Sequence, residues 1–503
     1  MNIFHVLKIR IMRPLVAVPL IFLGCTGLFR HTIFPTYGRL DDYVQIWRSN
    51  RVSLSEFVEP SLSFGRPLLF GFNGILYKIC QSVEFFWVLR LTGLLLFFTG
   101  SVLLVTPIYR STNNRFISFG LGSLIFCMPG TWVFLSWAQG AGHALAFTLA
   151  AVAATSIVRS KDHESKIMNL LSIFVPVCLC IFTYQPWGLS VPMLVIALGV
   201  ITNLDFETIY AKAKVALIST ISAFLLNIVI VQLNEDKNLS ARTSITNSFE
   251  AKFDWIIKEL FPRTLLPFST QTHFGLSLLV ALLWSIVVIY LFVKFKKYGK
   301  SQSGVAFFLA CALFLPLAPL IVIEENWASA RALLAGSFST WFLLISVVWR
   351  RFVLNLILGI QKRRLTNLIS CLVILLAATG SAIASNRSDE NLAKISATEW
   401  SNSKAILKNV PSDVDTVYVV KLPFFVPGIK TVSFDEYGIL SGSVSWSAPY
   451  LYSLALESAT GEKFDPTKFK ISEGAATCSS GPLIITDDVL RSTFINPYLL
   501  WDC

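Results

Sequence analysis

Long apolar runs, separated by short polar stretches, make up most of this chain. Each run has roughly 17 to 25 residues, the length that an α-helix needs to cross the hydrocarbon core of a bilayer. The pattern predicts about eleven membrane-spanning helices, the third of which is the shortest. Their expected ranges are 14–28, 85–107, 116–129, 139–158, 168–184, 188–203, 213–233, 274–293, 305–323, 332–349 and 365–384.

One further apolar stretch, at 67–80, is interrupted by Gly71, Asn73 and Gly74 and is short for a crossing. We expect it to form a helix that lies on the membrane surface. If this stretch does not cross, all the loops rich in Lys and Arg fall on one side of the membrane. The positive-inside rule favours that arrangement.

The same rule sets the expected orientation. The N-terminus is cytoplasmic, and its apolar run is expected to stay attached as an anchor, because no small-x-small cleavage site follows Leu28. The loops 30–84, 234–273 and 324–331 are then extracytoplasmic, as is the whole tail from Asn386.

Composition agrees with a protein that lives in the lipid bilayer. Of the 503 residues, 54% are hydrophobic and only 14% are charged, which is unlike an ordinary water-soluble globule. The net charge of +12 comes from basic residues dispersed among the cytoplasmic loops. No recognition motif accompanies them, so nucleic acid is not an expected partner.

A polar linker follows residue 384 and introduces a segment of roughly 115 residues, which is large enough for a small core of its own. Helices are expected at 393–408 and 449–457, and strands at 416–422 and 483–486. The sequence therefore predicts an α-helical polytopic membrane protein with a small C-terminal extracytoplasmic α/β domain. The expected boundary lies between 1–385, which includes the first outer loop at 30–84, and 386–503.

Two of the nine cysteines, Cys478 and Cys503, lie in this C-terminal segment. An extracytoplasmic compartment permits a disulfide between them, although sequence does not give their separation. The other cysteines fall in or near apolar runs, where they are expected to act as small packing residues.

Two adjacent carboxylates, Asp41 and Asp42, stand just beyond the first apolar run. A carboxylate in such a loop can accept a proton from an attacking hydroxyl, and two side by side favour a raised pKa for one of them. An acidic pair is more commonly a solvated surface feature. Walker loops, paired-histidine zinc helices and nucleophile elbows are missing from the sequence, and its scattered acids have no metal-ligand spacing. We therefore expect no cofactor, and a divalent metal is not indicated.

Two arginines share the extracytoplasmic side with the acidic pair. Arg66 lies in the element Gly65-Arg66-Pro67, and Arg331 ends the outer loop at 324–331. A guanidinium binds phosphate through a planar fork. The alternative is that Arg66 anchors the surface helix among headgroups and that Arg331 snorkels from the end of a span.

Weaker candidates lie in two other outer turns. Tyr184, Gln185 and Trp187 are expected to line a sugar pocket by stacking and hydrogen bonding. Glu324 and Glu325 are candidates for positioning an acceptor or a metal, although acidic residues at the end of a span commonly do no more than face water. The histidines at span ends, His143 and His273, are expected to be structural polar residues.

As a set, these features resemble the GT-C superfamily of polytopic glycosyltransferases, and within it the serotype-converting O-antigen glucosyltransferase family. The resemblance rests on the early acidic pair, the Gly65-Arg66-Pro67 element, the string of spans and the late outer loop that ends at Arg331. It covers the membrane part of the chain, to about residue 384.

The resemblance implies an inverting hexosyltransferase in a bacterial inner (cytoplasmic) membrane. It would move a sugar, with glucose expected, from a polyprenyl-phosphate donor to O-antigen, lipopolysaccharide or another cell-surface glycan on the periplasmic face. One of Asp41 and Asp42, with Asp42 slightly preferred, would be the general base. Arg66 and Arg331 would hold the lipid phosphate as it departs.

Two other classes of protein remain open. A flippase for a lipid-linked glycan would carry ionisable groups or broken helices at mid-membrane depth, whereas the interiors of the expected spans carry no charge except Arg90, which lies near an outer end. A glycan polymerase or ligase shares the compartment and the lipid donor, but would be expected to rely on large outer loops rich in arginine and histidine.

Overall fold

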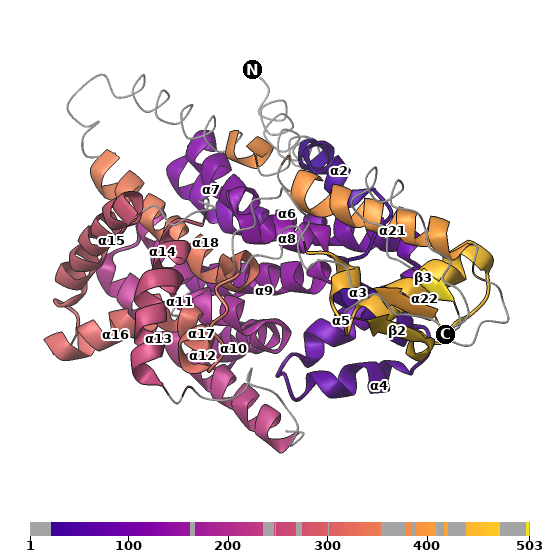
Figure 1. Cartoon of the computed structure of the whole chain (residues 1–503). Helices are drawn as coiled ribbons and strands as arrows, with labels where there is room; N and C mark the ends of the chain where they lie inside the picture. The colour runs from indigo at the N-terminus through magenta and orange to yellow at the C-terminus, as the bar shows by residue number, and fades with distance from the viewer. Residues whose placement is uncertain are drawn as a thin grey trace.

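The structure is a computed structural model, and the chain is predominantly helical (Figure 1). The structure describes residues 22–160, 166–234, 246, 248–267, 274–299, 301–353, 379–383, 386, 389–408, 410, 417–420, 439–472 and 499–501.

The main body is a bundle of apolar helices. Its members are α6 (Phe86–Thr112), α7 (Arg115–Cys127), α8 (Pro129–Ser136), α9 (Gly140–Arg159), α10 (Lys166–Thr183), α11 (Gln185–Ile201), α12 (Phe206–Leu233), α15 (Phe274–Phe295), α16 (Gln302–Phe314), η4 (Leu315–Leu317), α17 (Ala318–Val322), α18 (Ala330–Val347) and η5 (Val348–Val353). Six helices in the described ranges are long and apolar enough to cross a membrane, and the pair α7 and α8, bent by 59°, makes a seventh if it is one span. These helices define a multi-pass membrane protein, as the sequence predicted.

Each range expected between 85 and 349 coincides with a helix or a pair of helices, with ends displaced by a few residues. The helices α10 and α11 are shorter than a full crossing. The first expected span is described only from residue 22 and the last only at 379–383, so most of both lies outside the described residues.

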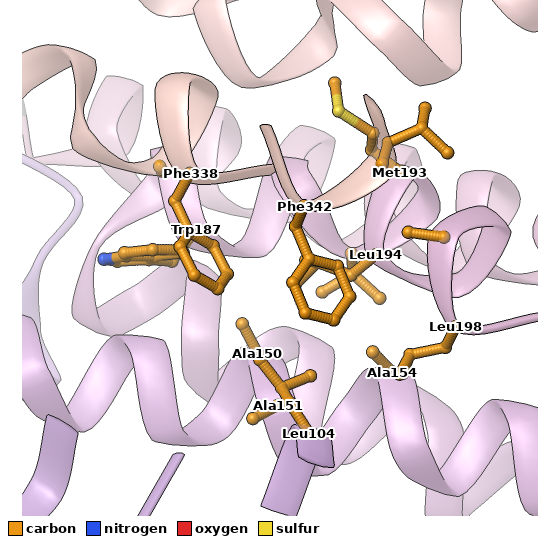
Figure 2. Packing of buried hydrophobic residues seen from close by; sticks show 14 of the residues in the cluster. Leu104, Ala150, Ala151, Ala154, Trp187, Met193, Leu194, Leu198, Phe338 and Phe342 are labelled. Carbon is orange, nitrogen blue, oxygen red and sulfur yellow. The ribbon is translucent and has the colours of Figure 1, made fainter. Parts of the chain in front are cut away.

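Helix α11 lies at the centre of the bundle, and each of its residues is buried. Figure 2 shows Trp187 and Leu194 of α11 packed between the alanines of α9 and the aromatic rings of α18. Ala150 and Ala151 are fully buried there. Small side chains let two helix backbones approach closely in a membrane protein, where packing rather than the hydrophobic effect drives helix association.

Short helices form the first loop. They are α2 (Arg30–Ile33), α3 (Asp41–Ser49), α4 (Leu54–Val58), η1 (Glu59–Ser61), α5 (Pro67–Cys80) and η2 (Val83–Phe85). A second group, α13 (Phe249–Trp255), η3 (Ile256–Leu260) and α14 (Phe261–Leu265), lies between α12 and α15. Helix α5 buries Asn73 and Tyr77 but leaves Ile75 and Ile79 exposed, which fits the surface helix expected at 67–80.

The C-terminal segment is a small α/β unit, as expected. Its described elements are η6 (Asp389–Ala393), α21 (Lys394–Leu407), β1 (Val417–Val420), η7 (Ser441–Ser443), α22 (Ala448–Thr460), η8 (Pro466–Lys468), β2 (Phe469–Ser472) and β3 (Leu499–Trp501). The sheet has the order β2-β1-β3, with β1 parallel to β2 and antiparallel to β3. The strand expected at 483–486, and both Cys478 and Cys503, lie outside the described residues.

This unit packs on the first loop, and Figure 1 shows α22 beside α3. One hydrophobic cluster contains Tyr43 and Phe57 of the loop together with Trp400 and Leu451 of the tail. The rings of Tyr43 and Trp400 are stacked, with centroids 5.7 Å apart. The two segments therefore share a core, although the sequence placed them in separate domains.

Candidate functional site

The carboxylate of Asp42 is completely enclosed. Its Oδ2 accepts hydrogen bonds from the backbone N–H groups of Arg39 and Ala138, each at 3.0 Å. Its Oδ1 accepts from the backbone N–H of Gln139 at 3.0 Å and from the hydroxyl of Tyr77 at 2.8 Å. The side chain thus connects α3 to the turn between α8 and α9 and to α5.

Burial raises the pKa of Asp42, because a charged carboxylate loses hydration in the interior, while its hydrogen-bond donors and the Arg90 guanidinium act in the opposite direction. Asp42 has an exposed fraction of 0%, and its four donors occupy the oxygens that a base would use. A carboxylate with no exposed surface is closed to a substrate hydroxyl. Asp42 therefore fits a structural role better than the role of the base.

Asp41, the neighbouring residue, is only partly buried. Its Oδ2 accepts a hydrogen bond from Nε2 of Gln139 at 2.9 Å. Successive residues of a helix point about 100° apart, so the two carboxylates at the start of α3 have different surroundings. Asp41 retains the access that an attacking hydroxyl needs.

The turn that joins α8 to α9 carries Trp137 and Gln139. The guanidinium carbons of Arg39 and Arg331 lie 5.8 Å and 4.5 Å from the centroid of the Trp137 ring. At such distances an arginine is attracted to the face of an indole. The turn therefore brings Arg331 to the region where Gln139 contacts Asp41.

Arg66 is held in place from α11 and α12. Its Nε donates to Oε1 of Gln185 at 3.0 Å. The amide nitrogen of Gln185 in turn donates to the carbonyls of Phe64 and Gly65, at 3.1 Å and 3.2 Å, and Nδ2 of Asn227 donates to the carbonyl of Gly65 at 2.7 Å. Gln185 thus supports the loop that presents Arg66.

Only glycine fits at position 65. Its φ is +65°, and a Cβ there would lie 2.5 Å from Oδ1 of Asn227. Glycine adopts a positive φ without steric cost. The Gly65-Arg66-Pro67 element is therefore the local device that turns the chain at the start of α5 and places Arg66 against Gln185.

His143 lies within electrostatic range of both arginines. Its ring stacks on Phe134 with centroids 4.1 Å apart and contacts the Tyr184 ring edge-on at 4.5 Å. The Arg66 guanidinium lies 5.0 Å above Tyr184, and both Arg66 and Arg331 lie close enough to His143 to interact with it electrostatically. In the part of the chain that the structure describes, no hydrogen-bond partner reaches the buried Nδ1 of His143.

Three helices begin at this site. Gln139 and His143 lie four residues apart at the start of α9, which places them on one face. Tyr184 precedes α11, and Arg331 lies in the first turn of α18. Two arginines and a buried imidazole therefore gather where these helices begin, and the arginines give the site positive charge.

Trp187 lies elsewhere. Its side chain has an exposed fraction of 0% and packs against Phe147 and Phe338, with ring centroids 4.8 Å and 5.8 Å away. The expectation that Trp187 lines a sugar pocket does not fit this position, because the hydrophobic core surrounds the indole (Figure 2). Tyr184, from the same turn, does lie at the site.

The loop that carries Glu324 and Glu325 packs beside α13. The ammonium group of Lys252 donates to the carbonyl of Glu325 at 3.3 Å and to Oδ1 of Asn326 at 2.8 Å. Glu324 is exposed. A role for either glutamate in binding an acceptor stays a prediction. Within the described ranges, no three His, Cys, Asp or Glu side chains gather closely enough to hold a metal ion.

Sequence reasoning missed the contribution of the α8–α9 turn. Gln139 was treated as the start of an apolar span and His143 as a structural polar residue, and Trp137 was given no role. The available signal was the polar pair Gln139 and His143 at helical spacing in an otherwise apolar stretch. Their closeness to Arg66 depends on contacts between distant helices, which periodicity along one helix does not contain.

The fold and these contacts define a multi-pass helical membrane protein with a polar, positively charged site where three helices begin. No protein-family model and no curated protein matches the sequence. Among solved structures, the chain is similar to the crystal structure of ArnT from Cupriavidus metallidurans bound to undecaprenyl phosphate, with 11% sequence identity and a TM-score of 0.41, over 87% of this chain and 84% of that one.

Proposed function

We propose that this protein is an inverting glycosyltransferase that uses a polyprenyl-phosphate-linked sugar as its donor. The observation that carries the proposal is that the α8–α9 turn brings an accessible carboxylate close to a cluster of basic side chains. An accessible carboxylate, Asp41, contacts Gln139, and one helical turn further along α9 His143 lies within electrostatic range of Arg66 and Arg331. A transfer from a phosphate donor needs both a base and a place for the departing phosphate.

In the proposed reaction, the Asp41 carboxylate takes the proton from an acceptor hydroxyl as its oxygen bonds to the anomeric carbon. The bond between that carbon and the phosphate oxygen breaks on the opposite face, so the configuration inverts. Arg66 and Arg331 neutralise the charge that grows on the lipid phosphate. His143 supports the same phosphate from a buried position, and Asp42 holds the turn that carries Gln139.

The cellular setting follows from charge and from the resemblance to GT-C enzymes. Basic loops on one side favour a cytoplasmic N-terminus and a periplasmic site, in a bacterial inner membrane where polyprenyl-phosphate sugars serve as donors. Glucose as the sugar, and O-antigen or another surface glycan as the acceptor, rest on the resemblance to the serotype-converting glucosyltransferases.

The test is the glycan composition of cells that lack the protein and are complemented with wild type, Asp41→Asn or Glu59→Gln at matched membrane abundance. Mass spectrometry of the surface glycan should show one added hexose per repeat with wild type and no addition with Asp41→Asn. An amide cannot accept the proton, and loss of a positioned base typically lowers a rate 10²- to 10⁴-fold, roughly. Glu59→Gln is the matched control, because Glu59 is an exposed carboxylate of the same loop and should leave the transfer intact.

Full hexose addition by Asp41→Asn would remove this carboxylate from the chemistry. Arg66→Gln and Arg331→Gln would then separate a flippase from a transferase. A flippase would show the lipid-linked sugar accumulating on the cytoplasmic side in these variants. A transferase should instead show it accumulating on the periplasmic side, because the donor has crossed but is not consumed.

A further inference from the structure

The C-terminal segment forms hydrogen bonds with one residue of the first loop, Leu40. The backbone N–H of Leu40 donates to Oγ of Ser441 at 3.0 Å, and its carbonyl accepts from Oγ of Ser447 at 2.9 Å. Both backbone polar groups of Leu40 are thus bonded to side chains that lie about four hundred positions later in the sequence. The tail therefore contacts the backbone of the first loop directly at Leu40.

That conformation is unusual. Leu40 has φ 42° and ψ −106°, in the positive-φ region that residues other than glycine rarely adopt. It directly precedes Asp41 and is the N-cap of α3, where it supplies no side-chain cap. Such a conformation persists only when its surroundings impose it. The direction in which α3 leaves Leu40, and with it the direction of the Asp41 side chain, depends on the contacts to the tail.

A buried carboxylate organises the contacting turn. Glu399 of α21 has an exposed fraction of 1%. Its Oε2 accepts from the backbone N–H of Ser441 at 3.1 Å, and its Oε1 accepts from that of Gly442 at 2.8 Å. A carboxylate that accepts two backbone N–H groups holds a tight turn in one shape. Glu399 therefore fixes the turn whose serine holds Leu40.

The groups that face Glu399 come from three other elements. Arg39, which precedes α3, acts on it through charge. The phenol groups of Tyr43 on α3 and Tyr452 on α22 lie close enough to feel its charge. Burial raises the pKa of Glu399 from 4.5 to about 7, against the opposing effects of its two backbone hydrogen bonds, the Ser441 side chain and Arg39. Its protonation state therefore changes near neutral pH.

We propose that Glu399 is a positioning residue, through which the C-terminal segment sets the conformation of Leu40 and hence the orientation of Asp41. The chain of contacts runs from Glu399 to the turn at Ser441, from Ser441 to Leu40, and from Leu40 to the first residue of α3. The inference rests on the proposed function where it gives the tail a part in positioning Asp41 for the reaction. The claim that Glu399 sets the conformation of Leu40 does not depend on that function.

The sign of the pH effect follows from linkage. An opening that exposes Glu399 to water returns its pKa from about 7 to its ordinary value of 4.5, so the closed state holds the proton more tightly. The opening is then rare at acidic pH, becomes more frequent as the pH rises from about 4.5 to about 7, and levels off above that. The opening constant should increase on the order of 100-fold across this window.

Hydrogen–deuterium exchange of the full-length protein in detergent or nanodiscs measures that opening. The amides of Leu40, Asp42, Ser441 and Gly442 are all hydrogen-bonded. In wild type, their exchange, corrected for the intrinsic pH dependence of amide exchange, should accelerate from pH 5 to pH 7.5, by an amount on the order of the 100-fold above. Glu399→Gln should abolish this extra dependence, because an amide does not titrate.

Two further variants keep the proposal falsifiable if Glu399→Gln folds poorly. Ser441→Ala removes the acceptor of the Leu40 N–H and should accelerate exchange at Leu40 and Asp42 at every pH while leaving the pH dependence at Gly442. Glu462→Gln changes an exposed carboxylate of the same segment and should match wild type throughout. The proposal fails if the amides of Leu40 and Asp42 show the same pH profile in wild type and Glu399→Gln, or if Ser441→Ala leaves them as slow as in wild type.

A transfer assay with a polyprenyl-phosphate hexose then joins this inference to the proposed function. Glu399→Gln should lower kcat on the order of tenfold, because a small displacement of a reacting group has effects of this size. The KM for the donor should be unchanged, because Arg66 and Arg331 keep their places. If Glu399→Gln changes the exchange but the wild-type protein transfers no hexose, the proposed function is rejected and the coupling stands. If Glu399→Gln exchanges like wild type and transfers hexose at the full rate, the coupling is rejected and the proposed function stands.

Discussion

Asp41 and Asp42 are adjacent residues of the same type, but their surroundings in the structure differ. Asp42 holds four donors from three segments in the interior, whereas Asp41 is partly exposed and contacts Gln139. The sequence identified the pair but preferred Asp42 as the base. It could not separate the two, because which carboxylate points inward depends on where α3 begins and on how Ala138 approaches it.

The buried carboxylate leads to a prediction about stability. Asp42→Asn places an NH₂ group opposite two of the four donors, whichever way the amide is turned, and leaves them without an acceptor. Buried donors of this kind cost about 1 to 3 kcal/mol each, so the free energy of unfolding should fall by about 2 to 6 kcal/mol. Thermal unfolding in detergent measures this.

Asp41→Asn is the control for that measurement. Its carboxylate is partly exposed and accepts from the flexible side chain of Gln139, so its replacement should shift the unfolding temperature much less. Equal shifts for both variants would contradict the structural role of Asp42.

At the scale of elements, periodicity located the apolar helices well, because each must hide its backbone in lipid. It did not show that residues 116–129 continue into a second helix after a bend. Pro129 is the first residue of α8, and proline at that position starts a helix as readily as it ends one. The role of the turn between α8 and α9 was missed because Trp137 falls between two expected spans and Gln139 was counted as the first residue of one.

That turn is tightly packed, and this supports a second prediction. A Cβ at Gly140 would lie 1.8 Å from the carbonyl oxygen of Phe134, so Gly140→Ala must displace the backbone that carries Gln139. It should reduce folded protein and abolish hexose transfer. Folded yield by size-exclusion chromatography, together with the transfer assay, measures both effects.

Gly71→Ala provides a matched comparison, since a Cβ there meets Val58 at an ordinary 3.8 Å. Alanine in a helix interior is favoured over glycine by roughly 0.5 to 1 kcal/mol. This variant should therefore be at least as stable as wild type and fully active. A destabilised Gly71→Ala protein, or a normal Gly140→Ala protein, would argue against the packing described here.

At the scale of the molecule, the boundary at 385/386 marked a change of composition correctly, but it did not mark a boundary of packing. The aromatic residues of the first loop, among them Tyr43 and Trp47, find their partners Trp400 and Tyr450 in the tail. Such contacts join segments hundreds of residues apart. Composition therefore identified both segments without showing that they form one core.

The shared core predicts that damage in the tail is felt in the first loop. Trp400 is 2% exposed, and Trp400→Ala should destabilise the protein by about 3 to 5 kcal/mol and accelerate proteolytic cleavage within residues 30–84. Limited proteolysis followed by mass spectrometry of the fragments measures the second effect.

Trp446→Ala is the matched control, because Trp446 belongs to the same segment but is 48% exposed. It should leave the cleavage rate of the first loop unchanged. If Trp400→Ala loosened the tail while residues 30–84 stayed as resistant as in wild type, the two segments would be independent domains after all.

A single residue, Tyr184, separates α10 from α11, and its ring lies between His143 and Arg66. An insertion or deletion of one residue near the end of either helix would rotate the following residues by about 100° and carry the ring out of the site. Residues 50–56 of the first loop are mostly exposed and are less constrained. As related chains diverge, insertions and deletions should therefore accumulate in the first loop, while the number of residues around Tyr184 stays constant. The site would then keep its geometry while the surrounding loops vary in length.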